Sequence, residues 1–170
     1  MQAPRIATLL PSATEIVSAL EFEHAIVVRS HECDYPPTIS AVPYCTKTKL
    51  EPMQSSSRIH DKVKFLVERA LSVYEVDSEL LRNVKPDIII TQAQCAVCAA
   101  TPNDLKESVA EWMGAPPRII TLEPSKLADI WGDIAVISQE LEIPNKGDRL
   151  VDSLKSRMKN ISDRANEANY

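Results

Sequence analysis

Residues 30–37 carry the densest group of chemically active side chains in this sequence. They read Ser-His-Glu-Cys-Asp-Tyr-Pro-Pro and follow a short apolar run that is typical of a β-strand. A second polar loop, residues 91–98, follows another apolar run. If the two strands are parallel neighbours, both loops open at the same edge of the sheet, where open α/β proteins hold ligands. We therefore expect a binding site built from strand ends.

Three cysteines and a histidine in these loops have the composition of a zinc or iron–sulfur site, because thiolates and imidazoles are the ligands those metals prefer. The four residues are Cys33, Cys95, Cys98 and His31. Two alternatives stay open, namely a redox or disulfide pair and inert thiols buried at strand ends. His31 could instead coordinate the metal of a bound chelate through a neutral imidazole.

Other side chains of the two loops are suited to non-covalent binding of an organic ligand. Tyr35 offers a flat apolar face for stacking on a large ring. The candidate polar contacts are His31, Glu32, Asp34, Gln92 and Gln94. The pattern shows no Ser/His/Asp nucleophile set and no carboxylate pair spaced for acid–base work, so we expect a binding protein and not an enzyme.

Composition narrows the class of partner. The chain has 170 residues, a net charge of −5, and only three glycines. It has no basic stripe for nucleic acid and no glycine-rich phosphate loop. No apolar run is long enough to cross a bilayer. Residues 1–5 lack the pattern of a secretory leader, which predicts a cytoplasmic protein.

Short apolar runs alternate with helical patterns along most of the chain. This alternation predicts an α/β fold, an open and mainly parallel sheet with helices on both faces, as in a Rossmann-like lobe. Ser12 and Glu15 have the spacing of a capping box, and Ser125 is expected to cap a later helix. The expected strands are residues 6–10, 25–28, 88–91 and 119–122, with a weaker one near Tyr44 and Cys45.

The C-terminal segment has a different pattern. Between residues 147 and 168 one narrow apolar stripe recurs at helical spacing, with charged and amide side chains elsewhere. Such a helix spans about 30 Å. We expect an α/β lobe over residues 1–144 and a long C-terminal helix over residues 145–170. The helix either lies across the lobe or leads to a second lobe absent from this chain, and its exposed stripe makes a homodimer plausible.

Three segments together resemble the cobalamin-type substrate-binding proteins of ABC transporters, in the helical-backbone metal-receptor superfamily. They are L-P-S-A-T-E at residues 10–15, the segment at residues 30–37, and K-P-D-I-I-I-T-Q at residues 85–92. The resemblance runs from Arg5 to about Asn166 and corresponds to the N-terminal lobe and the backbone helix. It implies that ligand lies in a cleft between two lobes, that Tyr35 faces the corrin or chelate, and that Glu15 lies on the surface that docks the permease.

We therefore expect one lobe of a receptor that binds cobalamin or a related metal chelate without catalysis. Because no leader pattern is found, the sequence argues against a permease as partner. The competing hypothesis is a cytoplasmic metal-binding or thiol-redox protein that uses Cys33, Cys95 and Cys98.

Overall fold

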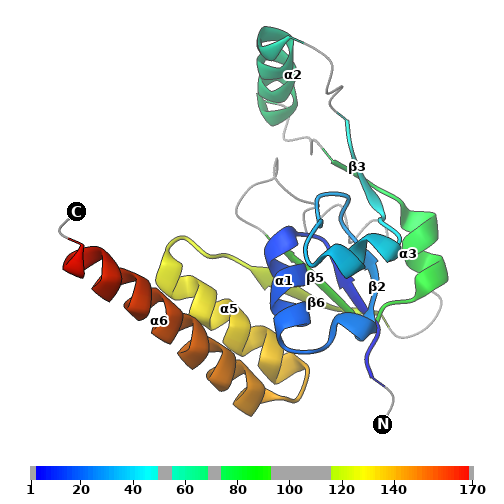
Figure 1. The fold of residues 1–170 in the computed structure, drawn as a ribbon. Coiled ribbons are helices and arrows are strands. Elements are labelled where there is room, and N and C mark those ends of the chain that lie inside the picture. Colours follow the sequence, from blue (N-terminus) through cyan, green and yellow to red (C-terminus); the bar gives the residue numbers. More distant parts are fainter. Residues whose placement is uncertain (1–2, 50–54, 69–73, 93–115, 169–170) are drawn as a thin grey trace. The chain divides into compact units, whose positions relative to one another are not determined.

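The main sheet of the computed structural model has four parallel strands (Figure 1). The structure describes residues 3–49, 55–68, 74–92 and 116–168. Across the sheet the order is β2-β1-β5-β6. The strands are β1 (Ile6–Thr8), β2 (Ile26–Arg29), β5 (Ile88–Gln92) and β6 (Arg118–Leu122).

The strand order decides where the polar loops emerge. The strands β2 and β5 are parallel, so the segments that follow them leave from the same edge of the sheet. The further condition set above, that the two strands are neighbours, is not met, because β1 lies between them. Two strand spacings therefore separate them, about 10 Å. The chain reverses its direction of progress across the sheet between β1 and β5, which is the position where open α/β sheets bind ligands.

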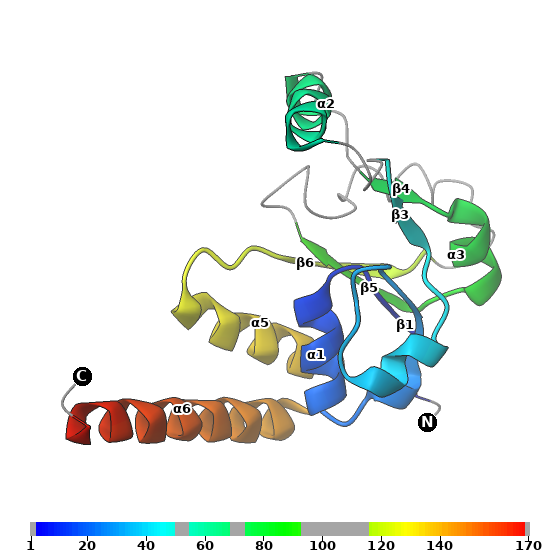
Figure 2. The ribbon, with the colours of Figure 1, turned by 45° about the horizontal axis from the view of Figure 1, so that its top comes forward.

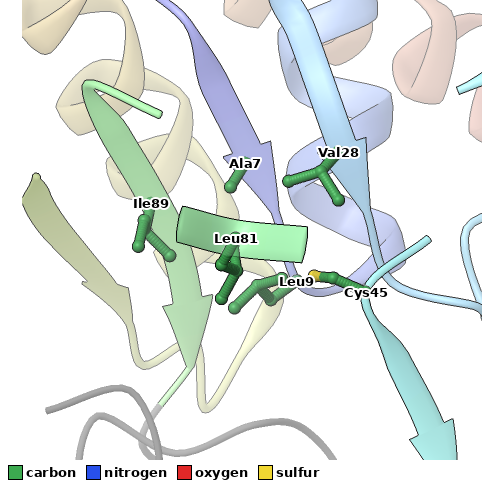
Figure 3. Close-up of a cluster of buried hydrophobic side chains, with 6 residues drawn as sticks. All are labelled: Ala7, Leu9, Val28, Cys45, Leu81 and Ile89. Carbon is green, nitrogen blue, oxygen red and sulfur yellow. The ribbon is translucent and has the colours of Figure 1, made fainter. Parts of the chain in front are cut away.

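Two helices cover opposite faces of this sheet. Helix α1 (Pro11–Ala19) lies on the face of Thr8, whose hydroxyl is 2.7 Å from that of Thr14. Helix α3 (Ser78–Val84) lies on the other face, where Leu81 packs with the side chains of Ala7, Val28 and Ile89 (Figure 3). Successive side chains of a strand point to opposite faces, so β1 supports both layers. The predicted α/β class is confirmed.

A small second sheet is inserted between β2 and α3. Strands β3 (Thr46–Thr48) and β4 (Tyr74–Val76) pair antiparallel (Figure 2). The weak strand predicted near Tyr44 begins slightly later, and Tyr44 itself forms an isolated parallel bridge with Arg29. The short helix η1 (Glu23–Ala25) precedes β2, η2 (Pro37–Ala41) lies between β2 and β3, and α2 (Ser56–Glu68) lies between β3 and β4.

The start of α1 differs from the sequence prediction. The helix begins at Pro11, its N-cap residue is Leu10, and no side chain forms a capping hydrogen bond there. Proline suits the first helical position because its φ angle is already helical and it has no N–H group to satisfy. Ser12 is therefore inside the helix, and the expected capping box with Glu15 does not form.

The contacts divide the chain into two compact units, residues 1–123 and 124–170. The second contains α5 (Leu127–Glu140) and α6 (Pro144–Glu167), which pack against each other. The predicted boundary after residue 144 lies inside this unit. With 24 residues, α6 is about 36 Å long, so the predicted long C-terminal helix is present.

The α5–α6 contact is close at Gly147, where an added Cβ atom would lie 2.1 Å from the Ser138 hydroxyl oxygen. The start of α5 is capped by Asp129, whose carboxylate accepts hydrogen bonds from the backbone N–H groups of Ser125 and Lys126. The predicted Ser125 cap is therefore replaced by a carboxylate from within the helix. No helix in the described ranges is both long and apolar enough to cross a membrane.

Candidate ligand-binding site

Arg29, the last residue of β2, fixes the backbone of the loop that follows. Its guanidinium donates hydrogen bonds to four carbonyl oxygens, those of Ser30, Cys33, Ile39 and Val42, at 2.8 to 3.1 Å. The residue is 9% exposed, and within the described part of the chain it has no carboxylate partner. Arginine suits this position because its planar fork can donate to several acceptors at once. The loop is thus held by a buried cation.

Cys33 connects the same loop to helix α1. Its thiol is 1% exposed, and the sulfur lies 3.0 Å from the Thr14 hydroxyl of α1. Burial raises the pKa of this thiol, and the hydrogen bond from Thr14 only partly opposes that effect. The neutral thiol is therefore favoured in the ligand-free protein. No group of three metal-ligating residues occurs in the described ranges.

His31 is held by the first residue of β3. The Thr46 hydroxyl oxygen lies 2.7 Å from His31 Nδ1, accepts from the His31 backbone N–H at 3.0 Å, and lies 3.0 Å from the Ser30 hydroxyl. Thr46 is 3% exposed, whereas His31 is half-buried. The second nitrogen, Nε2, has no hydrogen-bond partner among the described residues. The imidazole is therefore positioned through one nitrogen only.

Tyr74, the first residue of β4, contacts both His31 and Glu32. Its phenol donates a hydrogen bond of 2.6 Å to Glu32 Oε1. Its ring centroid lies 5.4 Å from that of His31, with the two planes tilted by 54°. The β3–β4 pair thus holds two successive residues of the loop. Thr46 of β3 contacts His31, and Tyr74 of β4 contacts both His31 and Glu32.

Two tyrosines near this network remain exposed. Tyr35 follows the fixed part of the loop and is 60% exposed. Tyr44 is 57% exposed, and the Arg29 guanidinium lies 5.6 Å from its ring centroid. Tyr44 and Thr46 also line a hollow of about 360 Å³, whose other walls are Lys47, Glu75, Val76, Asp77 and Ser78.

The other predicted site residues are less closely connected. Asp34 is exposed, and Gln92 is half-buried at the end of β5. Glu15 is exposed on α1, and neither a hydrogen bond nor an ion pair joins it to the described residues. Gln94, Cys95 and Cys98 lie outside the described residues. The predicted meeting of the two loops, and the metal set of Cys33, Cys95, Cys98 and His31, therefore stay predictions.

Sequence reasoning missed three residues that position the site, namely Arg29, Thr46 and Tyr74. Arg29 offered a signal, because a cation that closes an apolar strand needs partners if it is buried. Thr46 and Tyr74 offered none, since they are separated from His31 by 15 and 43 positions. Their role depends on how β3 and β4 pair.

No family model matches the chain, and no curated protein matches it. Solved structures do match. The periplasmic heme-binding protein RhuT from Roseiflexus sp. RS-1 is 22% identical with a TM-score of 0.65, over 98% of this chain and 51% of its own. The periplasmic vitamin B12 binding protein BtuF of Vibrio cholerae is 19% identical with a TM-score of 0.64, over 95% and 51%.

A periplasmic heme-binding protein from Pseudomonas aeruginosa is 16% identical, with a TM-score of 0.69 over 98% of this chain and 48% of its own. This chain thus spans about half the length of each matched structure. At these identities the likeness shows a shared fold.

The comparisons correct the predicted cytoplasmic location, because each of these three proteins is described as periplasmic. That prediction depended on a pattern missing from residues 1–5. The argument against a permease partner depended on the same premise and loses its support.

Proposed function

We propose that this chain is one lobe of a receptor that binds a metal chelate, cobalamin or a related macrocycle, without catalysing a reaction. The observation that carries the proposal is the loop after β2. Buried contacts from Arg29, Thr14 and Thr46 hold its backbone and its polar residues, while the ring of Tyr35 stays 60% exposed. A rigid loop that presents an aromatic face is suited to stacking, because little conformational entropy is lost on binding.

The position of this loop supports the same function. It leaves the edge of the sheet formed by the carboxyl ends of parallel strands, beside the reversal in strand order. Chelate pockets need mostly shape and a few well-placed polar groups. His31, Glu32, Asp34 and Gln92 would supply those groups around the stacked ring, with Gln94 as a further candidate.

The matched receptors support a ligand enclosed by more than this chain, because about half of each lies beyond the region it matches. We infer that the chain alone binds weakly and that a second wall completes the site. The wall would be a second lobe or a second copy of this chain. Exposed Met158 and Ile161 on α6 are apolar residues that such a contact would cover.

Glu15 remains the candidate docking residue for a permease. The carboxylate is exposed on α1 and is not used for capping, contrary to the sequence prediction. Its free charge would suit a cationic partner surface. Charge reversal, Glu15→Lys, should then lower stimulation of a reconstituted transporter while leaving chelate binding unchanged.

Titration of the protein with cobalamin and with haem tests the main proposal. We expect binding of at least one of them, and Tyr35→Ala should weaken it about two- to tenfold, the range for loss of an aromatic contact. Tyr35→Phe keeps the ring and should bind like the wild type. Leu127→Ala is the matched control, because Leu127 is a similarly exposed large apolar residue, 55% exposed, in the second compact unit. Absence of binding to both chelates at high concentration would refute the proposal.

A further inference from the structure

We propose that His31 meets the ligand as a hydrogen-bond donor through Nε2–H and does not coordinate the ligand's metal. The inference rests on the proposed function and deepens it. It names the chemistry that His31 recognises, which is an acceptor oxygen on the rim of the chelate, such as a carboxylate or an amide carbonyl. This role follows from which groups around the Thr46 hydroxyl can donate hydrogen bonds and which can accept them.

The Thr46 hydroxyl has one hydrogen and two lone pairs to share among three contacts. One lone pair accepts from the His31 backbone N–H, which can only donate. The remaining hydrogen and the remaining lone pair must therefore serve the other two neighbours, Ser30 Oγ at 3.0 Å and His31 Nδ1 at 2.7 Å. One of these two must donate to Thr46, and the other must accept from it.

Ser30 decides between the two arrangements. It is 3% exposed, and its oxygen accepts a long bond of 3.4 Å from the backbone N–H of Glu32. Thr46 Oγ1 is the single acceptor available to the Ser30 hydrogen among the described residues. If Ser30 donates to Thr46, then Thr46 donates to His31 Nδ1 and every hydrogen is used. In the reverse arrangement the Ser30 hydrogen is buried without an acceptor, which proteins avoid.

The tautomer of His31 follows from this count. Because Nδ1 accepts from Thr46, the proton of the neutral imidazole resides on Nε2. The Tyr74 ring, 5.4 Å away, limits rotation of the imidazole. Nε2 has no partner in the described part of the chain, so its N–H group is the one available to a ligand.

Metal coordination by His31 would need the opposite tautomer. A lone pair on Nε2 requires the proton on Nδ1, and a histidine that ligates a metal usually donates this second N–H to an acceptor. Thr46 could accept it only by turning its own hydrogen toward Ser30, which leaves the Ser30 hydrogen without an acceptor. The network therefore opposes coordination and favours donation.

The nitrogen chemical shifts of His31 test the tautomer directly. We expect ¹⁵N NMR of the ligand-free protein at about pH 8.5, where imidazoles are ordinarily neutral, to show the proton on Nε2. Thr46→Val removes the hydroxyl and should mix the tautomers, whereas Thr46→Ser keeps the hydroxyl and should keep the wild-type shifts. A proton on Nδ1 in the wild type overturns the proposal, whether or not a chelate binds.

Haem binding tests the consequence at the ligand, because haem carries carboxylates and its visible spectrum reports its axial ligands. His31→Ala should weaken haem binding about tenfold, as expected for loss of a hydrogen bond to a charged acceptor. His31→Gln retains an N–H donor and should recover most of that loss. Neither variant should change the spectrum of bound haem. A changed spectrum in both variants would show coordination and overturn the proposal, whereas absence of haem and cobalamin binding would refute only the proposed function.

Discussion

Replacing Arg29 with methionine removes the guanidinium that holds the loop after β2, and we expect both stability and loop order to fall. Methionine fills a similar volume but donates no hydrogen bond. Of the four carbonyls that Arg29 contacts, Ser30 also accepts from the backbone N–H of Cys33, and Ile39 also accepts from that of Val42. These two carbonyls keep a partner in the variant.

The carbonyls of Cys33 and Val42 have no other donor among the described residues, and the Cys33 bond is buried. An orphaned buried acceptor costs about 1–3 kcal/mol, and the partly buried one costs less. Removing a buried cation also recovers some of its desolvation energy. We therefore expect Arg29→Met to lower the free energy of unfolding by about 2–4 kcal/mol.

Urea unfolding followed by circular dichroism measures this loss, and amide hydrogen exchange over residues 30–42 locates it. Arg157→Met is the matched control, because Arg157 is exposed on α6 and should change stability by less than about 0.5 kcal/mol. Arg29→Lys keeps the charge but loses the planar fork of donors, so its free energy of unfolding should lie between those of Arg29→Met and Arg157→Met. If Arg29→Met and Arg157→Met agree within about 1 kcal/mol, the guanidinium does not hold the loop as argued.

Four further substitutions test the packing and the burial of a thiol. Gly147→Ala should lower the free energy of unfolding by about 1–3 kcal/mol, because the added Cβ atom would meet Ser138. Gly132→Ala has open space around the added atom and should raise the free energy of unfolding by about 0.5–1 kcal/mol. Equal effects of the two variants on the urea midpoint would contradict this contrast. Leu81→Ala should lower the free energy of unfolding by about 2–5 kcal/mol, because it leaves a cavity between α3 and the sheet. A urea midpoint equal to that of the wild type would refute the packing role of Leu81. Burial raises the pKa of Cys45 from 9.0 to about 12, so its contribution to stability is complete below pH 9 and is lost as pH rises toward 12. The difference in free energy of unfolding between the wild type and Cys45→Ala should therefore shrink by about 2 kcal/mol between about pH 9 and about pH 10.5. A difference that stays constant over this pH range in urea unfolding would exclude the effect.

The positions of the strands and the long helix could be predicted from the sequence because their signals are local. Ile88, Ile89 and Ile90 are buried on both faces of the sheet, and an unbroken apolar run is what such a strand requires. The start of α1 was harder to predict, since Pro11 and Ser12 both suit a helix terminus and only the backbone geometry selects between them.

The sequence by itself determined an α/β lobe with a reactive loop after its second strand, because hydrophobic periodicity and residue types are properties of neighbouring positions. Only the tertiary structure decided what that loop presents. It placed β1 between β2 and β5, buried Cys33 against Thr14, and brought Thr46 to His31. These outcomes depend on strand order and on contacts between distant residues, which local patterns do not encode. The chemistry of His31 is set by one such contact.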